Sequence, residues 1–382
     1  MSFVRRSFAL SLSLLLVAAC RPGVPGEATP SASSIAGALI PSQPMSVVYH
    51  LPGAPSGLHA PFAFMTQQEA LVGADITVSI ATPTAGVDPF AGADDPSTVD
   101  LYVASPAAAL SAREAGSDLV LIAGLAQQSD WRLVTPVTSG ISEITDLAGQ
   151  SIFVHGLPGD AATALAALSA AGVDLSSLSL TYATDLSSSF DPIPILDGTY
   201  AAAIVSSVDG WPRLVQGPDL VTGASVGVQG FVEFSITPTT FDTGLAIWAH
   251  ASALTNEDAK IAAAASLVAL AEGLAFCRDS IEDCAALLLG IGTSDQDQET
   301  LVWSVNALNN QLWPAAYGLF WIDTEGITNA VATGVSAGVL ASPFKDEYVD
   351  GSILALAEPH WPVDLDRNGE GWTLLSLEIP LY

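Results

Sequence analysis

Residues 151–182 read SIFVHGLPGDAATALAALSAAGVDLSSLSLTY. The stretch opens with a short apolar run at 151–155, continues with an alanine- and leucine-rich segment at 160–171, and closes with a second apolar run at 178–182. Two strand-length runs separated by a segment of helical length indicate a βαβ unit, in which the two strands pair in parallel. The centre of the chain is therefore expected to form an open sheet with a helix on its face.

The same alternation extends in both directions from this unit. Strands are expected at 46–50, 75–80, 99–103, 118–122, 200–205, 231–236 and 243–248, and helices at 61–71, from 106 and from 209. Short apolar strands that alternate with helices build open sheets covered by helices on both faces. We predict an α/β protein with two sheets.

From residue 257 onward the pattern is helical. In 257–275 apolar residues recur at three- and four-residue steps, as on one buried helix face. Further helices are expected at 282–289, 296–312, 327–339 and 345–357, and residues 358–382 are interpreted as an irregular tail. Gly334-Val-Ser-Ala-Gly338 matches a hydrolase nucleophile motif, but that motif requires a preceding strand, and here the preceding segment is helical. No catalytic residues are predicted.

The N-terminus has the pattern of an export signal. Arg5-Arg6 precedes the apolar run Phe8 to Ala19, and Cys20 follows two alanines, as in a bacterial lipobox. We expect residues 1–19 to be a lipoprotein signal peptide, Cys20 to carry the lipid, and 20–44 to form a tether. A plain signal peptide and a retained transmembrane helix are the alternatives, although the run is short for a span. Either the general or the twin-arginine export route fits.

The composition limits the partners and the compartment. Forty acidic residues against ten basic ones give a net charge of −30, which disfavours binding to nucleic acid. Cys277 and Cys284 stand seven positions apart where one helical pattern ends and another begins. In an oxidising compartment they are expected to form a disulfide, and two buried free thiols are the alternative.

A set of short motifs, in their order, resembles substrate-binding proteins of the NMT1/THI5-like group. The resemblance spans 46–357, although Gln150 stands where the group has lysine and Ala201 where it has aspartate. Because of these departures the identity of a ligand cannot be transferred. The motifs are Gly57-Leu-His-Ala-Pro-Phe62, Gly73-Ala-Asp-Ile-Thr-Val78, Ser142-Glu-Ile-Thr-Asp-Leu-Ala-Gly-Gln150, Gly156-Leu-Pro-Gly159, Ala171-Gly-Val-Asp174 and Leu196-Asp-Gly-Thr-Tyr-Ala-Ala202.

The resemblance implies a periplasmic binding protein type II fold, with two α/β lobes that close over a small molecule. Lobe 1 would comprise 45–136 plus 239–357 and lobe 2 would comprise 137–238, with crossovers near Val137-Thr138 and Pro238-Thr239. It also implies a monomeric protein without enzyme activity that serves an ABC permease and its ATPase, and the N-terminal pattern makes it exported and lipid-anchored. An exported sensor or an enzyme on the same scaffold is the alternative.

Ligands of open α/β sheets bind beyond the carboxyl ends of the strands. Ser105 and Asp160 also suit helix N-caps, Tyr49 and Trp211 suit packing roles, and the histidines suit structural hydrogen bonds. The candidates for ligand contact are Tyr49, His59, Ser105, His155, Gly156, Asp160, Ser206, Asp209 and Trp211.

The small number of basic residues affects which class of ligand is expected. Between 45 and 343 the basic residues are Arg113, Arg132, Arg213, Lys260 and Arg278, so an anion pocket has few cations to draw on. A neutral or weakly cationic heterocycle, such as a thiamin-precursor pyrimidine or a flavin, is therefore favoured over a sulfonate or nitrate.

No cofactor and no metal site are predicted. The five histidines show no metal-binding spacing. Asp364, Asp366 and Asn368 match the first half of a calcium loop, but Leu375 stands where a bidentate glutamate is expected, so calcium binding stays open.

Overall fold

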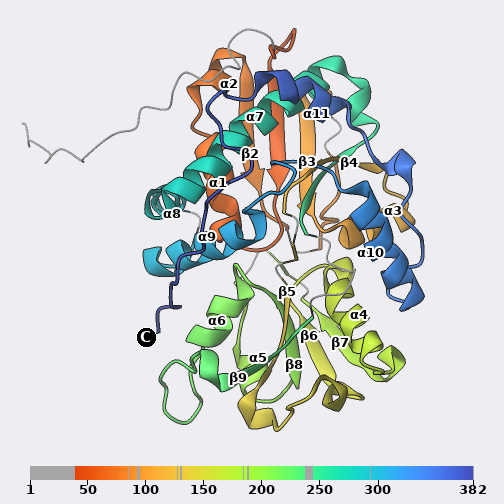
Figure 1. Cartoon of the computed structure of the whole chain (residues 1–382), viewed down its shortest axis with the longest axis vertical. Coiled ribbons are helices and arrows are strands. Elements are labelled where there is room, and N and C mark those ends of the chain that lie inside the picture. Colours follow the sequence, from red (N-terminus) through yellow and green to blue (C-terminus); the bar gives the residue numbers. More distant parts are fainter. Residues whose placement is uncertain are drawn as a thin grey trace, which may run out of the picture. The chain divides into compact units, whose positions relative to one another are not determined.

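Two five-stranded sheets organise the chain (Figure 1). The computed structural model describes residues 39–381 apart from 85, 93, 94, 127, 130, 184, 187, 188, 237–243 and 293. The described residues fall within one compact unit. The signal peptide, Cys20 and the tether up to residue 38 lie outside them, so the lipid anchor stays a prediction.

The first sheet has the strand order β2-β1-β3-β10-β4. Strand β1 pairs in parallel with β2 and β3, whereas β10 lies antiparallel between β3 and β4. A strand from late in the sequence thus lies between two strands from its first third. The strands are β1 (Met45–His50), β2 (Ile76–Ala81), β3 (Thr98–Ala104), β4 (Leu119–Gly124) and β10 (Ala246–His250).

The second sheet repeats this plan with the order β7-β6-β8-β5-β9. Strand β6 pairs in parallel with β7 and β8, and β5 lies antiparallel between β8 and β9. The predicted pair of mixed sheets is confirmed, and we call the first-sheet part lobe 1 and the second-sheet part lobe 2. The strands are β5 (Trp131–Pro136), β6 (Ser151–Val154), β7 (Ser179–Tyr182), β8 (Ala202–Ser206) and β9 (Phe231–Phe234).

The helices follow the strands, and the last five belong to the helical C-terminal part (Figure 1). Several begin at a side-chain cap, as when Asn256 accepts a hydrogen bond from the backbone N–H of Asp258. The helices are α1 (Ala60–Met65), α2 (Glu69–Gly73), α3 (Pro106–Glu114), α4 (Ala162–Ala170), α5 (Ile193–Leu196), α6 (Gly210–Gln216), α7 (Glu257–Asp279), α8 (Ile281–Gly290), α9 (Gln298–Leu312), α10 (Thr324–Ser336) and α11 (Ser352–Ala357).

Two predicted helices differ from the structure. The segment 61–71 splits into α1 and α2 because polar residues interrupt it, and the Thr66 hydroxyl donates back to the carbonyl of Ala63 at 2.8 Å. The segment 345–357 is helical only in α11 and in a short 3-10 turn at Asp346–Tyr348. Between these, Val349 forms a parallel bridge with Leu121 of β4, so the chain there extends the sheet instead of coiling.

Helix α7 is the central helix of lobe 1. Among the described helices it is long and apolar enough to cross a membrane, yet most of its apolar stretch is buried inside the protein. It approaches α1 so closely that a Cβ on Gly273 would overlap the carbonyl oxygen of Pro61. Packing against the first sheet and α1 therefore accounts for its apolar composition.

The first crossover between the lobes comes earlier than predicted. The sequence analysis missed β5, whose Leu133 and Val134 are fully buried in lobe 2. Because β4 and β5 belong to different sheets, the chain crosses between Gly124 and Trp131 and not at Val137-Thr138. Residues 131–136 thus belong to lobe 2 and not to lobe 1. The return expected at Pro238-Thr239 lies outside the described residues, although β9 and β10 on either side belong to different sheets.

The two crossover segments run beside each other. The backbone N–H groups of Leu125 and Ala126 both donate to the carbonyl of Leu245 at 2.9 Å. A Cβ on Gly244 would overlap the carbonyl of Ala126, so only glycine permits this approach. The two connections between the lobes therefore meet at one place.

The C-terminal tail links both lobes. Trp361 and Trp372 pack against the core of lobe 1, whereas Ile379 is buried in the lobe 2 core. The amide of Gln216, at the end of α6, donates to the carbonyl of Pro380 at 3.1 Å. The tail is irregular, as predicted, but it is tied down at both ends.

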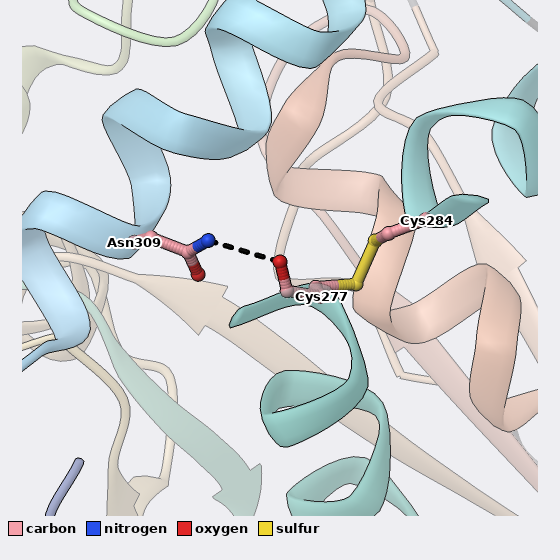
Figure 2. Close-up of a disulfide and its surroundings, with 3 residues drawn as sticks. All are labelled: Cys277, Cys284 and Asn309. Carbon is pink, nitrogen blue, oxygen red and sulfur yellow. Dashed lines mark hydrogen bonds between the residues drawn. A yellow bond between two sulfur atoms is a disulfide. The ribbon is translucent and has the colours of Figure 1, made fainter. Parts of the chain in front are cut away.

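Figure 2 shows that Cys277 and Cys284 are joined by a disulfide at the junction of α7 and α8. Their Cα atoms lie 5.0 Å apart, which is a normal span for such a bridge. The amide of Asn309 in α9 donates to the carbonyl of Cys277 at 3.0 Å. Three helices therefore meet at this corner.

Replacing both cysteines with serine should destabilise the protein by about 2.5 kcal/mol, because the bridge restricts a short loop of the unfolded chain. Urea unfolding of the wild type and of C277S/C284S measures this difference. Wild-type protein treated with a reductant should unfold like the variant. Equal midpoints for all three samples would contradict the prediction.

Glu272 of α7 makes the stability of lobe 1 sensitive to pH. Burial, and secondarily the charge of Asp364 in the tail, raise the pKa of Glu272 from 4.5 to about 7. The folded protein holds this proton more tightly than the unfolded chain. The resulting stabilisation is complete below about pH 4.5 and is lost as the pH rises through 7.

Glu272→Gln should remove this pH-dependent loss. A shift of this size would correspond to about 3 kcal/mol, and solvent screening at a partly exposed position reduces it to about 1 kcal/mol. E272Q should therefore melt above the wild type at pH 8 and close to it at pH 4.5. Melting curves at both pH values test this, and a constant difference between the two proteins would count against it.

Candidate functional site

A cavity lies between the two lobes, and both contribute to its wall. Its volume is about 50 Å³, which is enough for a few water molecules. The lining residues are Pro52, Gly53, Ser56, Leu58, Ala104, Ser105, Trp131, His155, Gly156, Leu157, Asp160, Leu186, Ser206, Val208, Asp209 and Leu245.

Six of the nine predicted ligand-contact residues line this cavity. They lie at or shortly after the carboxyl ends of parallel strands, which end toward the space between the lobes. Ser105 comes after β3, His155 and Gly156 after β6, and Ser206 ends β8. Asp160, in the turn before α4, and Asp209, just before α6, complete the set.

Tyr49, His59 and Trp211 are not among the residues that line the cavity. Tyr49 is fully buried, and its hydroxyl lies 2.8 Å from that of Ser266 in α7. His59 accepts a hydrogen bond from the backbone N–H of Ser56 at 3.2 Å, and burial lowers the pKa of His59 to about 3. Trp211 packs edge-on against Phe231 in the lobe 2 core. All three serve packing or structural roles here, so placing them at the site is corrected.

Ser105 and Asp160 connect the lobes across the cavity. The Ser105 hydroxyl accepts a hydrogen bond from the backbone N–H of Ala108 and donates to Asp160 at 2.7 Å. The other carboxylate oxygen of Asp160 accepts from the backbone N–H of Leu157 at 2.9 Å. Both residues therefore act as caps and also form a direct contact between the lobes.

Asp209 belongs to a charged network. One of its oxygens accepts from Nε of Arg213 at 2.8 Å and from the amide of Gln296 at 3.3 Å. The same guanidinium binds Asp295, before α9, through its two terminal nitrogens at 2.6 and 3.1 Å. Arg213 thus joins a lobe 2 carboxylate to a lobe 1 carboxylate.

His155 lies next to this network. Its Nδ1 is 3.9 Å from Oδ2 of Asp209. Burial lowers the pKa of His155 below 6.5 and outweighs the opposite effect of Asp209. The imidazole is therefore neutral at pH 7.

Several lining residues were not predicted, and Trp131 is the largest of them. It is the first residue of β5, the strand that the sequence analysis missed, so its position at this edge of the sheet could not be inferred. A Cβ on Gly156 would lie 2.5 Å from Cη2 of Trp131. Gly156 is thus needed because the indole rests against its backbone. Gly53, which follows β1, has a φ of +76° and forms the facing wall.

The described residues contain no group of three or more histidine, cysteine or acidic side chains placed to hold a metal ion. In the candidate calcium loop, one oxygen of Asp366 accepts from the backbone N–H groups of Asn368 and Gly369. Its second oxygen binds Arg278 at 3.2 Å. The loop is thus held by hydrogen bonds from its own backbone and by the bond between Asp366 and Arg278 of α7.

Residues 68–212 match the family model described as NMT1/THI5 like. This part of the chain is therefore similar to the NMT1/THI5-like family. The resemblance inferred from the order of short motifs is therefore confirmed. No curated protein sequence matches the chain.

Solved structures share the fold of this protein at low sequence identity. The ligand-binding component of an ABC-type import system from Staphylococcus aureus, with zinc bound, is 12% identical, with a TM-score of 0.57 over 83% of this chain and 99% of that one. The alkanesulfonate-binding protein SsuA from Xanthomonas axonopodis pv. citri, bound to MOPS, is 13% identical, with a TM-score of 0.53 over 83% and 97%. SsuA from Escherichia coli is 15% identical, with a TM-score of 0.52 over 81% and 90%. These matches confirm the periplasmic binding protein type II fold.

Gly159 allows the lobes to meet beside the cavity. A Cβ on Gly159 of lobe 2 would overlap the backbone of Ala107 and Ala108 in α3 of lobe 1. Gly159→Ala should therefore disfavour the closed arrangement, at a cost of about 1–3 kcal/mol for overpacking. Small-angle scattering should report a larger radius of gyration for G159A than for the wild type.

Gly290→Ala is the matched control for this variant. A Cβ there has nothing within 4 Å, and the residue ends helix α8. G290A should scatter like the wild type. An unchanged radius of gyration for G159A would show that the contact between the lobes tolerates the methyl group.

Proposed function

We propose that this protein is the solute-binding component of an ABC importer. The observation that carries the proposal is the cavity between the two lobes, which is lined by residues of both sheets' loops. A ligand held by both lobes stabilises the closed state, and a permease then recognises that state. The family match and the shared fold support this function.

The partners follow from the same proposal. They are a small-molecule ligand, an ABC permease and its ATPase subunits, and a membrane reached through the lipid on Cys20. The protein would be an exported monomer on the cell surface or in the periplasm. The enzyme alternative needs a nucleophile or an acid/base pair at the cavity.

Two classes of ligand are considered, a heterocycle and an anion. Scarce bases favour a neutral or weakly cationic heterocycle, such as a thiamin-precursor pyrimidine or a flavin. Two of the similar structures are of sulfonate-binding proteins, which favours the alternative, a sulfonate or nitrate. The charges around the cavity bear on this choice.

Native mass spectrometry of residues 21–382, expressed without the signal peptide and gently purified, tests the proposal. A discrete added mass that is lost on activation is expected, and removal of that ligand should increase the radius of gyration in small-angle scattering. Protein that keeps one radius with and without its ligand would contradict capture by lobe closure.

A second measurement addresses the transport partner. The genes beside this one should encode a permease and an ATPase, and the purified permease complex should bind the liganded protein more tightly than the empty one. Equal affinity for both forms would argue against delivery to a transporter.

A further inference from the structure

The charged groups that line the cavity are carboxylates. Asp160 and Asp209 are both buried, at 5% exposure each. None of the described lining residues is lysine or arginine, and His155 is neutral at pH 7. The wall of the cavity therefore carries negative charge and no free cation.

Oδ2 of Asp209 is an unused acceptor. It is buried and accepts no hydrogen bond from any described residue. It faces lobe 1, because a Cβ on Gly53, another lining residue, would lie 4.0 Å from it. A buried carboxylate oxygen without a donor is costly, since desolvation is not repaid by a hydrogen bond. A ligand that donates to this oxygen removes that cost.

The arginines of lobe 2 are already committed. Arg213 uses all three guanidinium nitrogens on Asp209 and Asp295. Arg132 binds Glu233 at 2.7 Å and the hydroxyl of Ser207 at 2.9 Å. Neither arginine is among the residues that line the cavity.

An anionic ligand therefore fits this site poorly. A sulfonate or nitrate offers only acceptor oxygens, so it cannot satisfy Oδ2, and it would be repelled by Asp160 and Asp209 across a short distance of low dielectric. A neutral amide can donate one hydrogen bond but leaves the charge unbalanced. A protonated amine or amidinium both donates and neutralises, in a strong charge-assisted hydrogen bond.

We infer that the site binds a small molecule through a protonated nitrogen, an ammonium or amidinium group, which donates to Oδ2 of Asp209 in the cavity between the lobes. The inference rests on the proposed function and narrows its ligand class. Ser105, Ser206 and Trp131 would surround the rest of the ligand.

Three probes that share one ring and differ in the polar group test this inference: benzamidinium, benzamide and benzenesulfonate. A second set, acetamidinium, acetamide and methanesulfonate, covers the case in which the ring is too large for the cavity. Thermal shift and calorimetry with the wild type should show binding of an amidinium at least tenfold tighter than that of its amide and sulfonate counterparts.

Asp209→Asn should weaken amidinium binding at least tenfold and bring it close to the amide. The matched control is Asp219→Asn, which makes the same chemical change in an exposed turn where the carboxylate accepts from the backbone N–H groups of Val221 and Thr222. D219N should bind as the wild type does. If D209N fails to fold, the ranking of probes on the wild type still decides the question.

Preferential binding of a sulfonate, absence of binding by either amidinium, or equal amidinium affinity of D209N and D219N would each overturn the inference. The mass of any copurified ligand separates this failure from failure of the proposed function. A bound anion that closes the lobes would leave the importer role standing and remove the cationic ligand. Lobes that never close would remove the importer role even if an amidinium binds at Asp209.

Discussion

The close approach of the two crossover segments is the constraint on which the two-lobed arrangement depends. Gly244 lies against the carbonyl of Ala126, and the carbonyl of Leu245 accepts two hydrogen bonds from the outgoing segment. Because both connections pass through one place, the lobes can rotate about it while their sheets stay intact. The cavity begins there, since Leu245 also lines it. Leu245 thus belongs both to the contact between the crossover segments and to the cavity wall.

Strand topology explains why polar groups gather in the cavity. In each sheet the parallel strands end toward the opposite lobe, and the residue that follows a strand there caps a helix or turns the chain. Ser105 and Asp160 do both, and their hydrogen bond crosses between the lobes. If the lobes met through apolar surfaces, these polar side chains would have no hydrogen-bond partners. Between the lobes they bind one another or face the cavity, as Oδ2 of Asp209 does.

The alternation of strands and helices was sufficient to predict the fold and to select six residues that line the cavity, because the rule on strand ends needs only strand positions. It failed where the pattern was weak. Trp131 to Pro136 combines an aromatic, a charge and a proline, so β5 was missed and the crossover was placed too late. Tyr49 was misplaced because side chains alternate between the two faces of a strand, and its own face packs on α7. Contacts between lobes, such as Arg213 with Asp295, join residues far apart in sequence and leave no local pattern.

The charged network couples ligand charge to lobe closure. When the lobes are closed, Arg213 is shared by Asp209 of lobe 2 and Asp295 of lobe 1, while Asp160 lies on the same cavity. Two carboxylates then share one guanidinium, and Asp160 adds a further negative charge to the cavity wall, so the closed arrangement holds more negative than positive charge. A cation at Oδ2 of Asp209 compensates that charge only where both lobes are present, so its affinity for the closed state exceeds that for the open one. By linkage, closure of the lobes strengthens ligand binding by the same free energy by which the bound ligand stabilises the closed state.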